Sequence, residues 1–187
     1  MTYKGLSIAA LFLLLIYTSC SKITESLQRD VVIVDTVYFE IPVIPNIGDE
    51  ATLPDIATTI DLEAQIKAQV QDLTASNLLS ARLKNLHLAL AEVKKDSIDI
   101  DNNFANLQSI KFSLTDGSKT DSLANITIPS TNLIGALALT PVILPETLKP
   151  QLSNPSMKYR ITVKAKKATV KVMNVRAAAS YIVTLAK

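Results

Sequence analysis

The sequence has one cysteine, one histidine and no tryptophan, and these scarcities exclude several classes of protein. A disulfide framework needs at least two cysteines, and zinc fingers and Cys/His metal clusters need several ligands of these two types. Only four glycines occur among 187 residues, which leaves no room for a glycine-rich phosphate loop or a dinucleotide fingerprint. Proteins held together by disulfides, proteins stabilised by zinc, and nucleotide-binding proteins with a glycine-rich loop are therefore excluded.

The first 19 residues have the layout of an export signal. Lys4 is the only charge before an apolar run of 12 residues at positions 6–17, whereas a membrane-spanning helix needs about 20. Thr18 and Ser19 are the small residues of a cleavage site, and Cys20 follows them. The segment resembles a bacterial lipoprotein signal peptide, which implies cleavage before Cys20 and lipidation of that residue. The alternative is a plain secretory peptide with an incidental cysteine, since Tyr17 stands where such signals usually have leucine.

Lipidation of Cys20 would make residues 20–30 a tether between the membrane and the folded chain. Each buried methylene of an acyl chain contributes ~0.8 kcal/mol, so two or three chains hold a protein on a membrane almost permanently. Ser21 stands where inner-membrane retention signals have aspartate, which favours the outer membrane. We expect localisation to the cell envelope.

Residues 31–187 are predicted to form a single domain. The whole chain is 48% hydrophobic and 19% charged, as globular proteins are, and about 168 residues bury roughly two thirds of their unfolded surface. β-branched and aromatic residues predict a first strand at 31–41, and prolines and a glycine predict a loop at 42–58. Leu62, Ile66, Val70 and Leu73 share one helical face, which predicts a helix at 61–73.

Residues 81–95 fit two patterns. Leucines at positions 79, 83, 86 and 90 favour a helix, whereas Leu86, Leu88 and the residues between them alternate as a strand does. Later segments are predicted as strands at 108–114, 122–128, 168–173 and 178–186 in an apparent meander, with a turn at 115–118 and one short helical turn within 145–152. The segment 157–166 alternates apolar and basic residues, which predicts a half-buried strand.

Several segments resemble uncharacterised lipoproteins of the Bacteroidota. They are Asp61-Leu62-Glu63-Ala64-Gln65-Ile66-Lys67, Arg82-Leu83-Lys84-Asn85-Leu86, Asn103-Phe104-Ala105-Asn106-Leu107-Gln108-Ser109-Ile110, Leu148-Lys149 and Lys158-Tyr159-Arg160-Ile161-Thr162-Val163. The resemblance is one of spacing across residues 58–187. It implies a mainly β fold, an antiparallel β-sandwich, immunoglobulin-like or similar, with one helix near its start. It also implies a strand at 81–92 and carries no catalytic residues.

The sequence has few candidate catalytic or metal-binding residues. A Ser/His/Asp or Cys/His mechanism would have to use His87, which lies among leucines and is predicted to be packed or at a sheet edge. The run Asp99-Ile100-Asp101-Asn102-Asn103 has alternating oxygen ligands but lacks the glycine and glutamate of an EF-hand, so we predict a solvated turn. We expect no enzyme activity, no metal and no cofactor.

The charges divide into two opposite parts. Residues 20–146 hold 17 acidic and 9 basic side chains, whereas residues 147–187 hold 9 basic and no acidic ones. A functional interpretation is an anion-binding face that meets anionic lipid, glycan or an acidic polymer. The structural interpretation is that the basic strands of residues 147–187 pair with acidic neighbours in the same sheet. The predicted basic face comprises Lys158, Arg160, Lys164, Lys166 and Lys171.

The sequence thus predicts a lipid-anchored binding or structural accessory protein of the envelope. A protein-interaction module would use an exposed sheet edge or the basic face. A carrier of an apolar or lipid ligand would need a cavity between two sheets, near the apolar stretch 133–144. A carboxylate-dependent hydrolase would need two converging acidic residues, and a glycan binder is disfavoured by the absence of tryptophan. Nucleic acid is not expected as a partner because the protein is exported.

Overall fold

A computed structural model describes residues 28–91, 98–129, 133–142 and 148–187. The predicted signal peptide, Cys20 and most of the tether lie outside these residues. No helix in the described ranges is both long and apolar enough to cross a bilayer. The strands are β1 (Gln28–Ile41), β2 (Glu50–Thr52), β3 (Ile56–Ala57), β4 (Leu78–Leu90), β5 (Leu107–Thr115), β6 (Thr120–Thr127), β7 (Ala136–Pro141), β8 (Lys158–Ala165) and β9 (Met173–Ala186). The helices are α2 (Leu62–Gln69), α3 (Leu148–Leu152) and the 3₁₀ turns η1 (Ala75–Asn77) and η3 (Phe104–Asn106).

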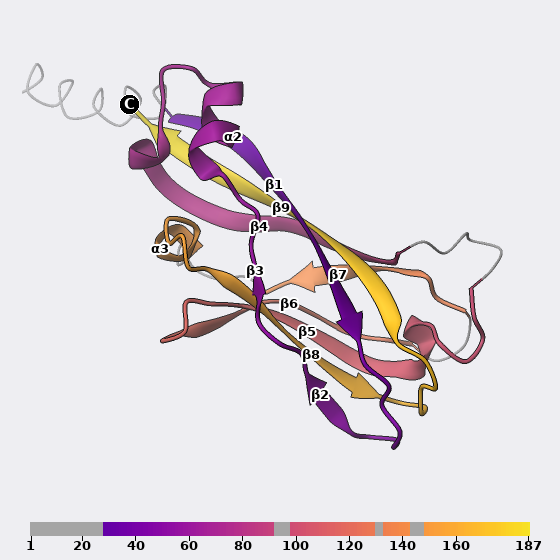
Figure 1. Ribbon diagram of the computed structural model, residues 1–187. Helices are drawn as coiled ribbons and strands as arrows, with labels where there is room; N and C mark the ends of the chain where they lie inside the picture. The colour runs from indigo at the N-terminus through magenta and orange to yellow at the C-terminus, as the bar shows by residue number, and fades with distance from the viewer. Residues whose placement is uncertain (1–27, 92–97, 130–132, 143–147) are drawn as a thin grey trace, which may run out of the picture.

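The strands form one antiparallel sheet that curls into two facing layers, in agreement with the predicted mainly β fold. The strand order is β1-β9-β4-β7-β6-β5-β8-β2, with β3 also paired to β8. In Figure 1 the long strands β1, β9 and β4 cross over β5, β6 and β8. Because β1 and β2 are the two ends of the strand order, the curl leaves an open seam between them.

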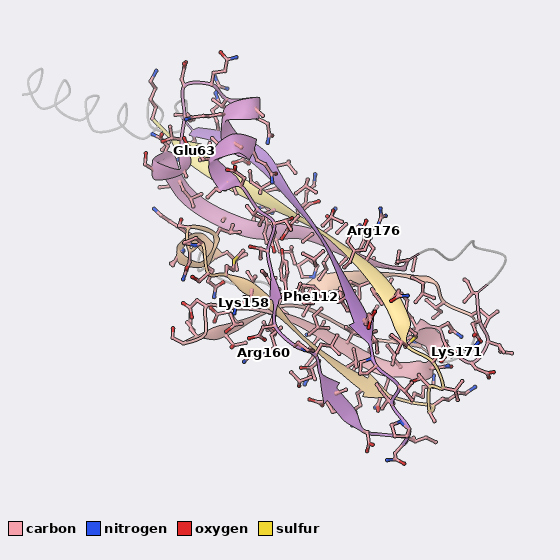
Figure 2. All side chains as sticks on the ribbon, in the orientation of Figure 1. Glu63, Phe112, Lys158, Arg160, Lys171 and Arg176 are labelled. Carbon is pink, nitrogen blue, oxygen red and sulfur yellow. The ribbon has the colours of Figure 1, made fainter. Side chains whose placement is uncertain are left out.

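The core lies between the two layers. The ring of Phe112 on β5 packs against Phe39 of β1 and Tyr159 of β8, with ring centroids 6.3 Å and 5.0 Å apart. All three rings are buried, and Phe112 lies deep among the strands in Figure 2. Side chains therefore fill the space between the layers at this point.

The ambiguous segment 81–92 is a strand for most of its length. Leu83 and Leu86 are both buried although they are three residues apart, because the register with β9 shifts between Leu83 and Asn85. A β-bulge adds one residue to a strand and so changes the spacing of the inward side chains from two to three. This bulge gives the leucines of the strand a spacing that resembles a helical stripe. Leu79, which a helix with that stripe would bury, is exposed.

Several predicted boundaries are corrected. β1 begins at Gln28, inside the predicted tether, and the predicted loop 42–58 contains β2 and β3. The helix is shorter than 61–73 because it ends at Gln69, although Leu73 is buried beyond it. The predicted hairpin at 108–128 is confirmed as β5 and β6, and the half-buried strand at 157–166 as β8.

The predicted meander at the C-terminus is wrong. β9 does not pair with β8 but lies between β1 and β4, and the predicted strand at 168–173 is a loop that leads into β9. The amides of this loop are bonded elsewhere. Val170 and Lys171 donate to Asn102, and Thr169 accepts from the amide of Ile44 and donates to its carbonyl. Side-chain and loop acceptors thus take the place of a strand ladder.

Candidate functional site

The predicted basic face is only partly assembled. Lys158, Arg160 and Lys164 lie on β8 on the side away from the core. Lys166 follows the end of that strand, and Lys171 lies in the loop before β9. Figure 2 places Lys171 at one end of the molecule, well away from Lys158 and Arg160. The five residues therefore do not form one surface. Exposed Lys111, on the neighbouring strand β5, was not among the predicted residues because its position beside β8 depends on the strand order.

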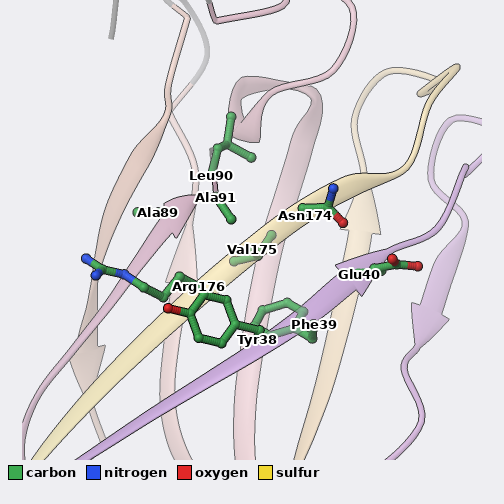
Figure 3. A pocket seen from close by; sticks show the side chains of 9 residues that line it. All are labelled: Tyr38, Phe39, Glu40, Ala89, Leu90, Ala91, Asn174, Val175 and Arg176. Atoms are coloured by element: carbon green, nitrogen blue, oxygen red, sulfur yellow. The ribbon is translucent and has the colours of Figure 1, made fainter. Parts of the chain in front are cut away.

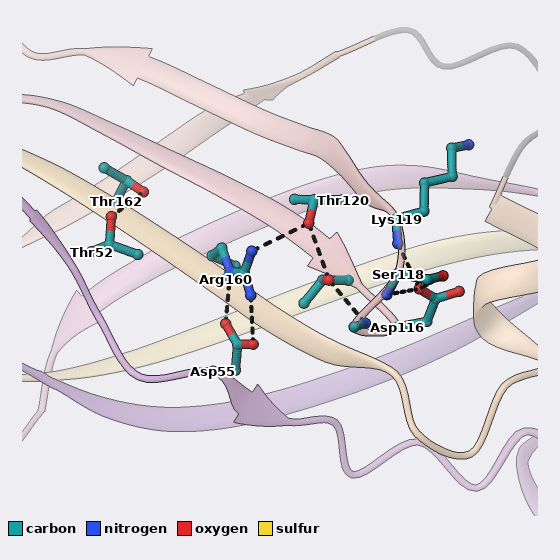
Figure 4. Close-up of polar contacts among 10 residues, drawn as sticks. Thr52, Asp55, Asp116, Ser118, Lys119, Thr120, Arg160 and Thr162 are labelled. Atoms are coloured by element: carbon teal, nitrogen blue, oxygen red, sulfur yellow. Dashed lines mark hydrogen bonds and ion pairs between the residues drawn. The ribbon is translucent and has the colours of Figure 1, made fainter.

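Two of the five basic residues are bound to aspartates. The Arg160 guanidinium donates from Nε and Nη2 to the two carboxylate oxygens of Asp55, both at 2.8 Å (Figure 4). This bidentate pair raises the pKa of Arg160 and holds the pKa of Asp55 below its usual value, mainly through the hydrogen bond itself. Lys171 Nζ lies 3.1 Å from Asp99 Oδ2. Pairing with acidic neighbours thus accounts for Arg160 and Lys171.

The Asp99–Asn103 run, predicted as a solvated turn, is exposed at Ile100 and Asp101 only. Asn102 and Asn103 are buried, and Asn102 Oδ1 accepts from the backbone amides of Val170 and Lys171 at 3.0 Å and 2.8 Å. Asn103 Oδ1 accepts from the amide of Ala105 at 2.8 Å. These oxygens are occupied by backbone donors, and no group of three metal-ligating side chains occurs among the described residues.

A buried polar network joins the two layers. Asp35 points inward from β1 and is 2% exposed. Tyr159 Oη donates to Asp35 Oδ2 at 2.9 Å and lies 2.8 Å from Tyr181 Oη, while Thr59 bonds Asp35 Oδ1 through its amide and its hydroxyl. Burial raises the pKa of both tyrosines. Because its oxygens are satisfied and hidden from solvent, we assign this network to stability and not to a reaction.

The outer edge of β1 is covered over one half only. Gln69 accepts from the amide of Val32 at 3.1 Å and donates to its carbonyl at 2.7 Å. Gln65 does the same with Val34, at 2.8 Å and 2.9 Å. The glutamines are four residues apart on α2 and match strand residues two apart, so their amide groups take the place of a neighbouring strand.

The other half of this edge is open. Backbone groups of a strand point alternately to its two sides, so those of Thr36, Tyr38 and Glu40 face the same way as those of Val32 and Val34. No described residue bonds the amide or the carbonyl of these three. Pro42, which has no N–H, follows at the next position of this series. We call residues Thr36–Glu40 the edge window.

Two hollows meet at the edge window. One, of about 680 Å³, lies on the outer face of β1, β9 and β4, and Figure 3 shows Tyr38 beside Arg176 at its rim. The other, of about 560 Å³, lies in the seam, where it is lined by Phe39, Pro42, Leu53 and Ile56 together with the acidic Glu40 and Asp55. Tyr38 is 66% exposed between them. No pattern in the sequence indicates this window, because an open edge depends on which strands end the sheet.

The remaining features predicted from the sequence, namely His87, the apolar stretch 133–144 and Cys20, do not form a site among the described residues. His87 lies exposed on the outer face of β4, between two paired neighbours, and is therefore neither packed nor at an edge. The apolar stretch 133–144 contributes β7 and borders an open recess of about 410 Å³ with Leu90 and Ile98. Cys20 lies outside the described residues.

Comparison with known proteins does not assign a family. No family model matches the chain, and no curated protein matches it. Among solved structures, "Crystal Structure of FLHE" shares 9% identity and a TM-score of 0.29 over 84% of this chain and 98% of that one. The BFDV capsid protein shares 10% identity and a TM-score of 0.34 over 86% and 95%. A Desmodium yellow mottle tymovirus chain shares 14% and 0.29 over 82% and 87%. These likenesses are too weak to carry a functional argument.

Proposed function

We propose that this protein is a lipid-anchored, non-catalytic accessory of the bacterial cell envelope that binds another polypeptide. Acyl chains on Cys20 hold the domain on a membrane, in our proposal the outer membrane. The observation that carries the binding role is the half-covered edge of β1. Proteins generally block open strand edges because such edges recruit other chains. Here Gln65 and Gln69 block one half, and the other half keeps three residues with free backbone groups.

The filled core supports binding at the surface over carriage of a ligand inside. Phe112, Ile110 and Leu114 of β5 and Ile161 and Val163 of β8 have no exposed area. The recess near residues 133–136 is open to the surface and lies at one end of the layers. An apolar ligand between the layers would have to displace packed side chains, at a cost of several kcal/mol.

Site-specific photocrosslinking in cells tests the binding role. A photoreactive residue at Tyr38 is expected to give an adduct with one discrete second polypeptide. The same residue at His87, which is exposed on a strand with both edges paired, is the matched control. Adducts at both positions in equal yield, or at neither, would contradict a specific partner at the β1 edge.

Membrane attachment is tested separately. Mass spectrometry of the protein from the membrane fraction is expected to find an N-terminal acylated Cys20. Cys20→Ser should move the protein to the soluble envelope fraction. An unmodified cysteine within an otherwise intact chain would overturn the anchor and leave the binding role to be judged by the crosslinks.

A further inference from the structure

We propose that the edge window binds an extended segment of another polypeptide as an added antiparallel strand, in which a basic residue lies opposite Glu40 and apolar residues face the seam. This inference rests on the proposed binding function and specifies its ligand. The kind of partner follows from the backbone groups, the hollow and the charges at the window.

The backbone groups require an extended ligand. Thr36, Tyr38 and Glu40 each present one donor and one acceptor, spaced two residues apart, and the backbone of another extended strand matches that spacing. The window spans about 13 Å at ~3.3 Å per residue. Gln65 closes it at one end by bonding Val34, and Pro42, which has no N–H, closes it at the other. The ligand segment therefore pairs over about five residues.

The seam specifies the inward side chains of the ligand. Residues of the added strand opposite Val37 and Phe39 would point the same way as those two buried side chains, towards the seam. The hollow there has about 560 Å³ and apolar walls that include Pro42, Leu53 and Ile56. Two apolar side chains of the ligand, separated by one residue, would enter this hollow and gain the burial that an edge pairing alone does not provide.

Charge specifies the residue opposite Glu40. Glu40 is exposed and no described residue forms an ion pair with it, whereas the other acidic residue of the hollow, Asp55, is held by Arg160. None of the residues that line this hollow is basic. Opposite charges in directly opposed strand positions are favourable, so a lysine or arginine of the ligand fits opposite Glu40.

The ligand comes from another protein. Residues 20–27 span at most ~29 Å, whereas Tyr38 lies ten residues, or ~33 Å, along β1 from Gln28. The tether therefore does not reach Tyr38 or Glu40 and cannot pair along the window. A second copy paired symmetrically about Tyr38 would place Thr36 opposite Glu40, which leaves the carboxylate without a cation. The predicted ligand pattern, read from the residue opposite Glu40, is basic, apolar, polar, apolar, polar.

Binding of labelled peptides to the purified mature domain tests the inference. The probe is a fluorescein-labelled Lys-Val-Thr-Val-Thr peptide, blocked at both ends and followed by fluorescence anisotropy. N-methylation of its central threonine removes the N–H that faces the carbonyl of Tyr38 and should weaken binding at least tenfold. N-methylation of the first valine removes an N–H that faces away and is the matched control. Equal effects of the two would overturn pairing at this edge.

Variants of the protein test the same contacts from the other side. Tyr38→Pro removes one free N–H that the fold does not use, and Tyr38→Ala keeps it. Only the proline should abolish binding, with melting curves checking that both variants fold. Replacing the lysine of the peptide by glutamate should weaken binding at least tenfold, and Glu40→Lys should reverse that preference. An unchanged preference would overturn the charge assignment.

The outcomes separate this inference from the proposed function. If Tyr38 crosslinks to a partner in cells but neither peptide charge form binds the domain, the binding role stands and the ligand pattern is wrong. If light scattering finds a dimer that Tyr38→Pro dissociates, the occupant is a second copy and the inference is wrong. If peptides bind in solution but no adduct forms at position 38 in cells, the proposed function fails.

Discussion

Asp35 is an acidic residue on the inward face of a core strand, and its partners explain how it is tolerated. Tyr159 and Thr59 donate to its two oxygens, and Tyr181 extends the network to β9. A buried polar group is costly only when its hydrogen bonds are missing. The sequence alone did not predict the partners of Asp35, because Thr59 and Tyr159 lie 24 and 124 residues away along the chain.

Tyr159→Phe is expected to lower the free energy of unfolding by about 1–3 kcal/mol, because it leaves one buried oxygen of Asp35 without a donor. Tyr181→Phe should cost less, since the bond from Tyr159 to Asp35 remains. Urea denaturation of the two variants measures the difference. Equal losses would show that Tyr159 does not have a special role in satisfying the carboxyl group.

Burial of the two tyrosines also predicts alkaline sensitivity. Their pKa values are raised in the folded protein, so the fold binds the phenol protons more tightly than the unfolded chain does. Stability is therefore fully present below about pH 10 and falls as the pH rises above it, towards the raised pKa values. Denaturant midpoints at pH 8 to 12 measure this fall. It should be less steep in Tyr181→Phe, and an identical slope would contradict the assignment.

The turn between β5 and β6 predicts the opposite, acidic dependence. Asp116 accepts from the amides of Ser118 and Lys119 and from the Ser118 hydroxyl, which lowers its pKa from 3.8 to about 2 (Figure 4). Its contribution is present above pH 4 and is lost as the pH falls towards 2. Asp116→Asn should reduce the fall of the denaturant midpoint between pH 4 and 2. Asp72→Asn, at an exposed aspartate with no described hydrogen bond or ion pair, is the control.

At the scale of elements, the sequence predicted regular periods well and their interruptions poorly. The alternation in β8 and the stripe of Leu62 and Ile66 on α2 were both confirmed, because each is local and uninterrupted. The bulge of β4 made a strand look helical, and the loop at 168–173 looked like a strand although its amides bond to a distant asparagine. The role of Gln65 and Gln69 on α2 was not predicted, because their partners Val34 and Val32 lie more than 30 residues away.

Removal of those glutamines is expected to extend the open edge of β1. In Gln65→Ala/Gln69→Ala the backbone groups of Val32 and Val34 lose their partners, which makes five residues of the series available to another strand. Light scattering and thioflavin binding should detect more self-association than in the parent protein. Gln71→Ala, an exposed glutamine just beyond the helix, is the control and should behave as the parent does.

At the scale of the whole molecule, the two layers depend on contacts between residues far apart in sequence. The curl of the sheet could not be predicted from the sequence, because strand order is set by which long-range pairings bury the most apolar surface. The positions of the basic residues also could not be predicted. The linear pattern predicted one basic face, whereas in the fold Arg160 and Lys171 form two separate ion pairs.

Phe112→Ala is expected to lower the free energy of unfolding by about 3–5 kcal/mol, because Phe112 is fully buried where β1, β5 and β8 meet. Tyr38→Ala removes an exposed ring of similar size and should change stability by less than about 0.5 kcal/mol. Thermal and denaturant unfolding measure both. A small loss for Phe112→Ala would mean that the layers do not share one core.

The location of the edge window on β1 has a mechanical consequence. The tether enters the domain at Gln28, the first residue of the strand that carries the window. If acyl chains hold Cys20 and a partner pairs with Thr36–Glu40, a pull between membrane and partner runs along the covalent backbone of β1. The load does not have to pass through the core or through the other layer, so the domain need not unfold to transmit tension.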